Sequence, residues 1–156
     1  MRRNDREVTD IRGICKILDE CKTCHVAMRD EEEEYIVPLN YGYTLEGGVL
    51  TLYFHSAKEG RKMDIWKRCR DVCFAVSHEG ALHTAPSPCG YGYCYSSVIG
   101  WGAVEFIEDA ADKCSALSLL FLHQTGERIT FSPQQAGSVC VYKIICTRFT
   151  AKRRTM

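Results

Sequence analysis

The sequence predicts an α+β domain whose main element is a small antiparallel sheet, rolled into a closed or half-closed β-barrel with short flanking helices. Three observations lead to this prediction. Most of the chain reads as short strands joined by turns, helical periodicity is confined to three segments, and the longest strand-like run contains Gly100 and Gly102. Glycines within a long strand are typical of a bulge or a barrel corner. Closing a sheet also removes edges that would otherwise aggregate.

The first half of the chain supplies one helix and three strands. Thr9 or Asp10 can cap a helix whose apolar residues recur at helical spacing as far as Cys21. The expected strands are residues 23–29, 35–43 and 49–54, joined by an acidic turn at 30–34 and a glycine turn at 46–48. Because these strands are joined by short turns, hairpins are expected.

The second half alternates helices and strands. In order we expect a helix at 60–67, a strand at 72–77, a Pro/Gly-rich loop at 80–92, a strand at 95–106, a helix at 109–123 and a last strand at 138–149. Asp109 and Asp112 suit the positive end of the third helix. These elements make a single domain over residues 1–156, with peripheral tails at 1–10 and 150–156.

Composition excludes some classes of protein. The 156 residues carry 20 basic and 20 acidic side chains, without the basic excess typical of nucleic-acid-binding domains. No apolar run is long enough to cross a bilayer, and the charged start is not followed by an apolar signal-peptide segment. We therefore expect a cytoplasmic protein with no nucleic-acid and no membrane partner.

The junction at residues 50–62 is the strongest candidate site. An alternating strand runs into a polar turn, and a helix then begins with Arg61 and Lys62. A helix N-terminus presents unpaired N–H groups and a partial positive charge. Ser56 adds a donor, and the two cations suit a phosphate group. The pattern predicts a phosphate cradle, with a solvated basic turn as the alternative.

Ten cysteines are many for a chain of this length. Without an export signal they are expected to be reduced and to act mainly as small core hydrophobes. Cys21-Lys22-Thr23-Cys24-His25 matches the pattern for covalent haem attachment, but that pattern belongs to exported proteins, and a redox pair lacks its βαβ context. An alternative zinc site has irregular spacing: His78, His83, Cys89 and Cys94. We predict no metal site.

Four ordered blocks of sequence resemble the flavin-binding proteins related to pyridoxamine 5′-phosphate oxidase, and in particular their nitroimidazole-resistance (Nim) branch. The blocks are residues 3–10, 35–42, 53–62 and 97–102. The resemblance implies an FMN-binding split barrel that works as a homodimer, with a flavin at each interface site.

The resemblance also implies which residues bind the flavin. The isoalloxazine ring would lie along Val37, Pro38, Leu39 and Asn40. The ribityl chain and phosphate would be lined by His55, Ser56 and Ala57, with Arg61 and Lys62 as the charge clamp. Ser97 and Val98 would meet the flavin of the facing subunit. His55 is the candidate catalytic residue, either as a proton donor to the substrate or as a hydrogen-bonding partner of the flavin.

These expectations describe an FMN-dependent oxidoreductase that takes electrons from NAD(P)H or a protein donor and reduces a small planar substrate, with nitroaromatics among the candidates. Two alternatives remain open: a non-catalytic flavin- or haem-binding or sensor module, and a structural protein that binds a metal through Cys and His. Fold and cofactor do not fix the reaction. The loop at 89–94 is expected to cover the entrance of the site.

Overall fold

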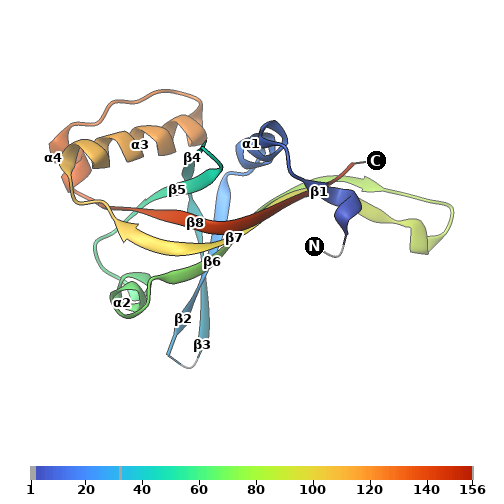
Figure 1. The fold of residues 1–156 in the computed structure, drawn as a ribbon, viewed down its shortest axis with the longest axis horizontal. Coiled ribbons are helices and arrows are strands. Elements are labelled where there is room, and N and C mark those ends of the chain that lie inside the picture. The colour runs from blue at the N-terminus through green and yellow to red at the C-terminus, as the bar shows by residue number, and fades with distance from the viewer. Residues whose placement is uncertain (1–2, 32, 156) are drawn as a thin grey trace.

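The computed structural model describes residues 3–31 and 33–155. Its strands form one antiparallel sheet in the order β3-β2-β6-β7-β8-β5-β4, with β1 paired to β8 (Figure 1). The strands are β1 (Glu7–Val8), β2 (Thr23–Asp30), β3 (Glu33–Asn40), β4 (Gly42–Glu46), β5 (Val49–Ser56), β6 (Asp71–His83), β7 (Gly92–Phe106) and β8 (Cys140–Arg154). The predicted α+β fold with an antiparallel split barrel is confirmed. The barrel is not closed, because β3 and β4 lie at opposite ends of the hydrogen-bonded order.

Most of the α-helices begin after a residue whose side chain caps the helix N-terminus. They are α1 (Ile11–Glu20), α2 (Arg61–Arg68), α3 (Ala110–Thr125) and α4 (Pro133–Gly137), with 3-10 turns η1 (Asn4–Arg6) and η2 (Pro88–Gly90). The carboxylate of Asp10 accepts the Gly13 N–H at the start of α1. Asp109 does the same for two N–H groups at the start of α3. None of the helices in the described residues is long and apolar enough to cross a membrane.

The predicted strand at 35–43 is wrong, because Tyr41 divides it into β3 and β4. The Tyr41 side chain is fully buried, and its hydroxyl donates to the carbonyl of Leu18 in α1 at 2.8 Å. Glu32, in the predicted acidic turn, lies outside the described residues. The turn between β4 and β5 follows the prediction, because Gly47 and Gly48 both have positive φ angles, of 57° and 82°.

Strands β6, β7 and β8 are longer than predicted. The expected loop at 80–92 is shorter, since β6 continues to His83 and β7 begins at Gly92. Together they form an arm that projects from the barrel (Figure 1). Residues 150–154, expected to be a tail, are the end of β8, where Ala151 is buried and pairs with Val8. Residues 1–2 and 156 lie outside the described part of the chain.

The irregularity predicted near Gly102 is present in the pairing of β7 with β8, but the extra residue lies on β8. Trp101 pairs with Arg148 and Gly102 with Cys146, so Thr147 of β8 is skipped in the register. A Cβ atom on Gly102 would lie 2.2 Å from the carbonyl oxygen of Ile145, so this approach of the two strands requires glycine.

Two hydrophobic cores hold the domain together. The larger one fills the barrel and includes Ile17 and Leu18 from α1 and Trp66 from α2. The smaller one lies between the helices α3 and α4 and strand β8, where Leu117 and Ala136 pack with Val141. Helix α2 is thereby fixed between the end of β5 and the turn between β2 and β3.

Candidate functional site

The β5–α2 junction has the geometry of an anion site. Helix α2 starts at Gly60, whose φ of 126° requires glycine and which provides no side-chain cap. Its carbonyl accepts the N–H groups of Met63 and Asp64. Within the described residues, the N–H groups of Arg61 and Lys62 have no hydrogen-bond acceptor. An uncapped helix N-terminus of this kind attracts an anion through these groups and through the helix dipole.

The last two side chains of β5 point to opposite faces of the sheet. His55 points out of the barrel and is exposed, whereas Ser56 is half-buried and lies beside α2. The Ser56 hydroxyl donates to the carbonyl of Ala57 at 2.9 Å. Ala57 is exposed in the turn that leads to Gly60. The hydroxyl and the free N–H groups of α2 therefore come from one short segment, residues 56–62.

Partial desolvation of the imidazole ring changes the pKa of His55. Neighbouring protein atoms remove water from part of the ring and lower the pKa of His55 below its usual value. The imidazole is therefore mainly neutral at neutral pH, when it can donate one hydrogen bond and accept another.

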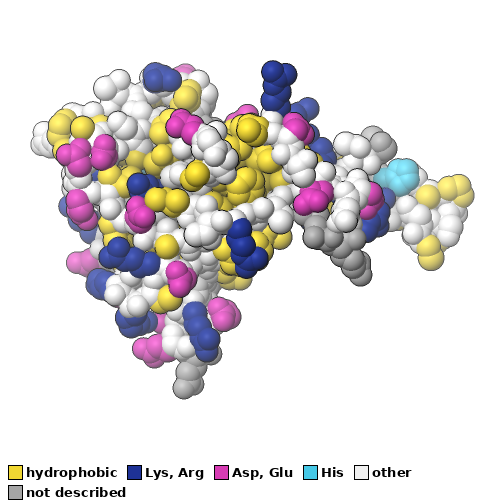
Figure 2. All heavy atoms as spheres, in the orientation of Figure 1, with side chains coloured by type: hydrophobic (Ala, Val, Ile, Leu, Met, Phe, Trp, Pro, Cys, Tyr) yellow, Lys and Arg dark blue, Asp and Glu magenta, His cyan; other side chains and the backbone are white. Residues whose placement is uncertain are grey.

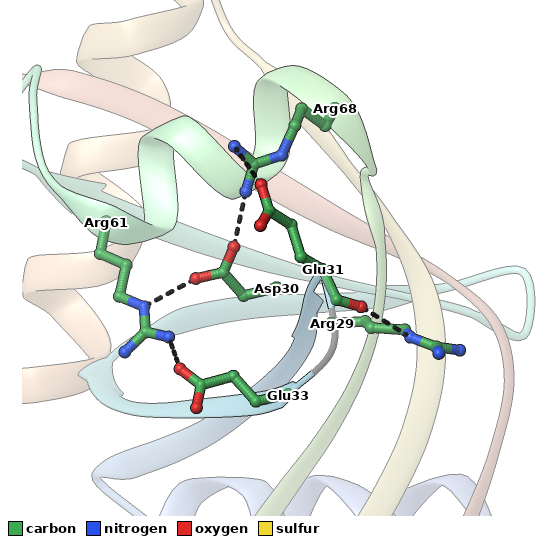
Figure 3. Close-up of polar contacts among 6 residues, drawn as sticks. All are labelled: Arg29, Asp30, Glu31, Glu33, Arg61 and Arg68. Atoms are coloured by element: carbon green, nitrogen blue, oxygen red, sulfur yellow. Dashed lines mark hydrogen bonds and ion pairs between the residues drawn. The ribbon is translucent and has the colours of Figure 1, made fainter.

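Arg61 points away from the junction, towards the turn between β2 and β3 (Figure 3). Its Nε donates to Asp30 at 2.8 Å, its Nη2 donates to Glu33, and its guanidinium lies over the ring of Tyr35 at 4.5 Å. Arg68 donates to the other oxygen of Asp30 at 2.5 Å. The charge of Arg61 is therefore engaged by carboxylates, which raise its pKa further.

Lys62 is the second residue of α2, and the turn that leads to this helix begins directly after the end of β5 at Ser56. The strand partner of Ser56 is Cys140 at the beginning of β8. Burial raises the pKa of the Cys140 thiol, and the positive charges of Lys113, Lys62 and Lys58 oppose this rise. Of the two predicted phosphate-binding cations, Arg61 is thus engaged by carboxylates away from the junction.

The predicted flavin-ring segment of β3 alternates between two faces. Val37 and Leu39 are half-buried and pack against the barrel core, whereas Pro38 and Asn40 are exposed. The side-chain amide of Asn40 donates to the carbonyl of Lys22 at 3.1 Å. A planar ligand lying on one face would meet only one of these pairs through side chains and the other through the backbone.

Ser97 and Val98 are separated in the same way. Ser97 is half-buried on the outer face of β7, and Val98 is fully buried in the barrel core. Only Ser97 can present its side chain to a second subunit.

The structure does not assemble the alternative metal and haem sites. No three His, Cys, Asp or Glu side chains in residues 3–31 and 33–155 lie close enough together to hold a metal ion. Cys21 and Cys24 are buried, and all ten cysteines are free thiols. Burial raises the pKa of Cys21 to about 11 and that of Cys24 still further, so both thiols stay protonated and unreactive.

The sequence matches a known family of proteins over most of its length. The family model described as pyridoxamine 5′-phosphate oxidase matches residues 10–153. The chain belongs to the pyridoxamine 5′-phosphate oxidase family. A search of curated protein sequences gave no match.

Solved structures of this family include a similar protein from Bacteroides thetaiotaomicron. It is described as a "putative 5-nitroimidazole antibiotic resistance protein" and is 32% identical, with a TM-score of 0.80 over 94% of this chain and 86% of that chain. This relative supports the resemblance to the nitroimidazole-resistance branch.

Two more distant structures show the same fold. The flavocytochrome Anf3 from Azotobacter vinelandii is 22% identical, with a TM-score of 0.79 over 100% of this chain and 72% of that chain. A FAD and heme binding protein from Mycobacterium smegmatis is 15% identical, with a TM-score of 0.81 over 97% and 74%.

Proposed function

We propose that the protein binds a flavin nucleotide, FMN, and reduces a small planar acceptor. The observation that carries the proposal is the uncapped start of α2 beside Ser56 and Lys62, in a chain of the pyridoxamine 5′-phosphate oxidase family. Free N–H groups, a hydroxyl and an ammonium are the donors that a phosphate monoester requires. Structures of the same fold include one described as a flavocytochrome, one as a FAD and heme binding protein and one as a FAD-binding protein.

A bound flavin would supply the redox chemistry, and the protein would supply orientation and protons. Lys62 and Ser56 would hold the phosphate end, which fixes the position of the flavin ring. His55 lies next to Ser56 and points out of the barrel, where a substrate can approach. It would either donate a proton to the reduced acceptor or hydrogen-bond the flavin.

The active form in this proposal is a homodimer. The outer faces of β2, β6 and β7 carry half-buried apolar side chains that lie next to one another across the sheet: Ala27, Cys73, Ala75, Ile99 and Trp101. Hydrophobic side chains also gather where β7 and β8 run (Figure 2). A second copy would cover such a surface by two-fold symmetry. It would also provide a second wall for a flavin, since a ligand site buries most of its ligand.

The test is an absorbance spectrum of the purified protein before and after anaerobic addition of NADH. The reductase is supported if the absorbance corresponds to about one flavin per chain, if NADH bleaches the flavin bands, and if a nitroaromatic acceptor then reoxidises the flavin. Bands that persist with all donors support a non-catalytic binding module. A featureless spectrum after titration with FMN contradicts flavin binding.

A variant makes the test specific for the junction. Lys62→Ala should retain less FMN while the dimer persists, because Lys62 does not lie on the apolar outer face. Lys16→Ala, at an exposed position of α1, is the matched control and should retain FMN normally. Equal FMN retention in both variants would remove Lys62 from the site.

A further inference from the structure

A phosphate at the β5–α2 junction would be bound more tightly by cations in addition to Lys62. Arg61 is not free to supply this charge, because Asp30 and Glu33 already accept hydrogen bonds from its guanidinium. A cation from another part of the fold is therefore the candidate to strengthen phosphate binding there.

Helix α3 brings such a cation, Lys113. The segment before this helix is attached to β8, where the N–H of Ile107 donates to the carbonyl of Val141 at 3.0 Å. Val141 is the strand partner of His55, and it packs under Ala116 of α3. The first two turns of α3 therefore lie over the β8 position that neighbours the end of β5.

The side chain of Lys113 is directed into the protein surface rather than into solvent. Only 17% of it is exposed, and its ammonium forms a long ion pair of 3.8 Å with Glu108, whose side chain is 84% exposed. An exposed pair of this kind contributes little and is easily replaced by a stronger anion.

Lys113 lies in the first turn of α3, one turn before Ala116, which packs with Val141 next to Cys140, the strand partner of Ser56. The charges of Lys113, Lys62 and Lys58 oppose the rise in the pKa of the Cys140 thiol, and the charge of Glu108 adds to it. Lysines from three segments, the turn after β5, helix α2 and helix α3, thus lie near one end of the Ser56–Cys140 pair.

We propose that Lys113 is a phosphate-binding residue and completes an anion cradle with Lys58 and Lys62, in place of Arg61. The cradle would recognise the phosphate of a flavin nucleotide, so this inference rests on the proposed function. Binding would replace the contact between Lys113 and Glu108 with a charge-assisted hydrogen bond to a phosphate oxygen.

The experiment compares FMN with riboflavin, which has the same ring and ribityl chain but no phosphate. Each is titrated against flavin-free protein by fluorescence quenching. Lys113→Gln should lower the affinity for FMN by about tenfold or more and leave that for riboflavin unchanged, because only the phosphate contact is lost. Lys143→Gln is the matched control. Lys143 is a half-buried lysine on β8, 3.5 Å from Glu105, and its loss should change neither affinity.

Lys113→Arg separates a phosphate contact from a structural role, since it restores the charge and should restore most of the FMN affinity. Unchanged FMN affinity in Lys113→Gln overturns the inference while the proposed function stands. An equal loss for FMN and riboflavin that Lys113→Arg does not repair also overturns it. Wild-type protein that binds neither flavin overturns the proposed function and this inference together.

Discussion

The guanidinium of Arg61 is held by the carboxylate of Asp30, which accepts a hydrogen bond from Nε at 2.8 Å. Asp30 is only 17% exposed on its side chain, and it also accepts a hydrogen bond from Arg68, so one carboxylate ties both ends of α2 to the turn between β2 and β3 (Figure 3). The relationship gives Arg61 a structural role that differs from the one predicted from the sequence motif.

Replacing Arg61 should therefore affect the hairpin more than the cofactor. We expect Arg61→Gln to keep FMN affinity within about threefold of wild type, because the Arg61 guanidinium points away from the junction and donates to Asp30 and Glu33. Amide hydrogen exchange should become faster in residues 28–35. Fluorescence titration with FMN and exchange mass spectrometry measure the two effects. A drop in FMN affinity as large as that of Lys62→Ala would return Arg61 to the phosphate clamp.

The sequence motif could predict part of this site and not the rest, for a geometric reason. Ser56 and Lys62 are close in the chain, and a strand–turn–helix junction brings them together. Arg61 and Lys62 are adjacent in sequence, but neighbouring residues of an α-helix project about 100° apart. The direction that Arg61 takes depends on Asp30, which is distant in the chain. Lys113 had no local signal, because only the packing of α3 on β8 brings it to the junction.

The fold was more predictable than the site. Strand alternation predicts the antiparallel sheet, and the glycines of β7 predict an irregularity where the register of β7 with β8 shifts. The break at Tyr41 was missed because the residues around it keep the pattern of a strand. Only the buried hydrogen bond to Leu18, a contact between distant segments, shows why the chain turns there. The lengths of β6 and β8 were underestimated because pairing with β7 sustains strands whose own sequences read as loop or tail.

The apolar outer face predicts how the dimer can be broken. Ile99→Asp places a charge at the centre of this face, between Ala75 on β6 and Thr150 on β8, and should produce monomers in size-exclusion chromatography with light scattering. Val49→Asp is the control, because Val49 is 49% exposed at the start of β5. A dimeric Ile99→Asp variant would place the interface elsewhere.

The cysteines should differ sharply in reactivity. Cys69 and Cys89 are exposed and should react with a thiol reagent within minutes in the native protein. Cys21 and Cys24 are buried with raised pKa values, so they should react only after unfolding. Mass spectrometry of time-resolved alkylation gives the order. Rapid native labelling of Cys21 or Cys24 would revive the redox-pair alternative.

His123 should contribute to the stability of the fold, because its ring links α3 to the carbonyl of Leu18 in α1 and to that of Tyr41 between β3 and β4. Its Nδ1 lies 2.6 Å from the carbonyl oxygen of Tyr41 and its Nε2 lies 3.0 Å from that of Leu18. Each carbonyl also accepts a second hydrogen bond, from Gln124 and from the Tyr41 hydroxyl respectively. His123→Phe should therefore lower the free energy of unfolding by about 1–2 kcal/mol rather than more. Urea unfolding checks this, and no change would show that the two contacts contribute nothing net.

The pH dependence of turnover can decide what His55 does. If His55 donates a proton to the substrate, only its imidazolium form is competent. Burial lowers the pKa of His55, so this form is lost as the pH rises through a value below that of an ordinary histidine. We expect kcat for a nitroaromatic acceptor to fall over that acidic range, and His55→Gln to give a lower rate without this fall. A wild-type kcat that does not change across the range, together with a shifted flavin spectrum in His55→Gln, would identify His55 as a residue that orients the flavin.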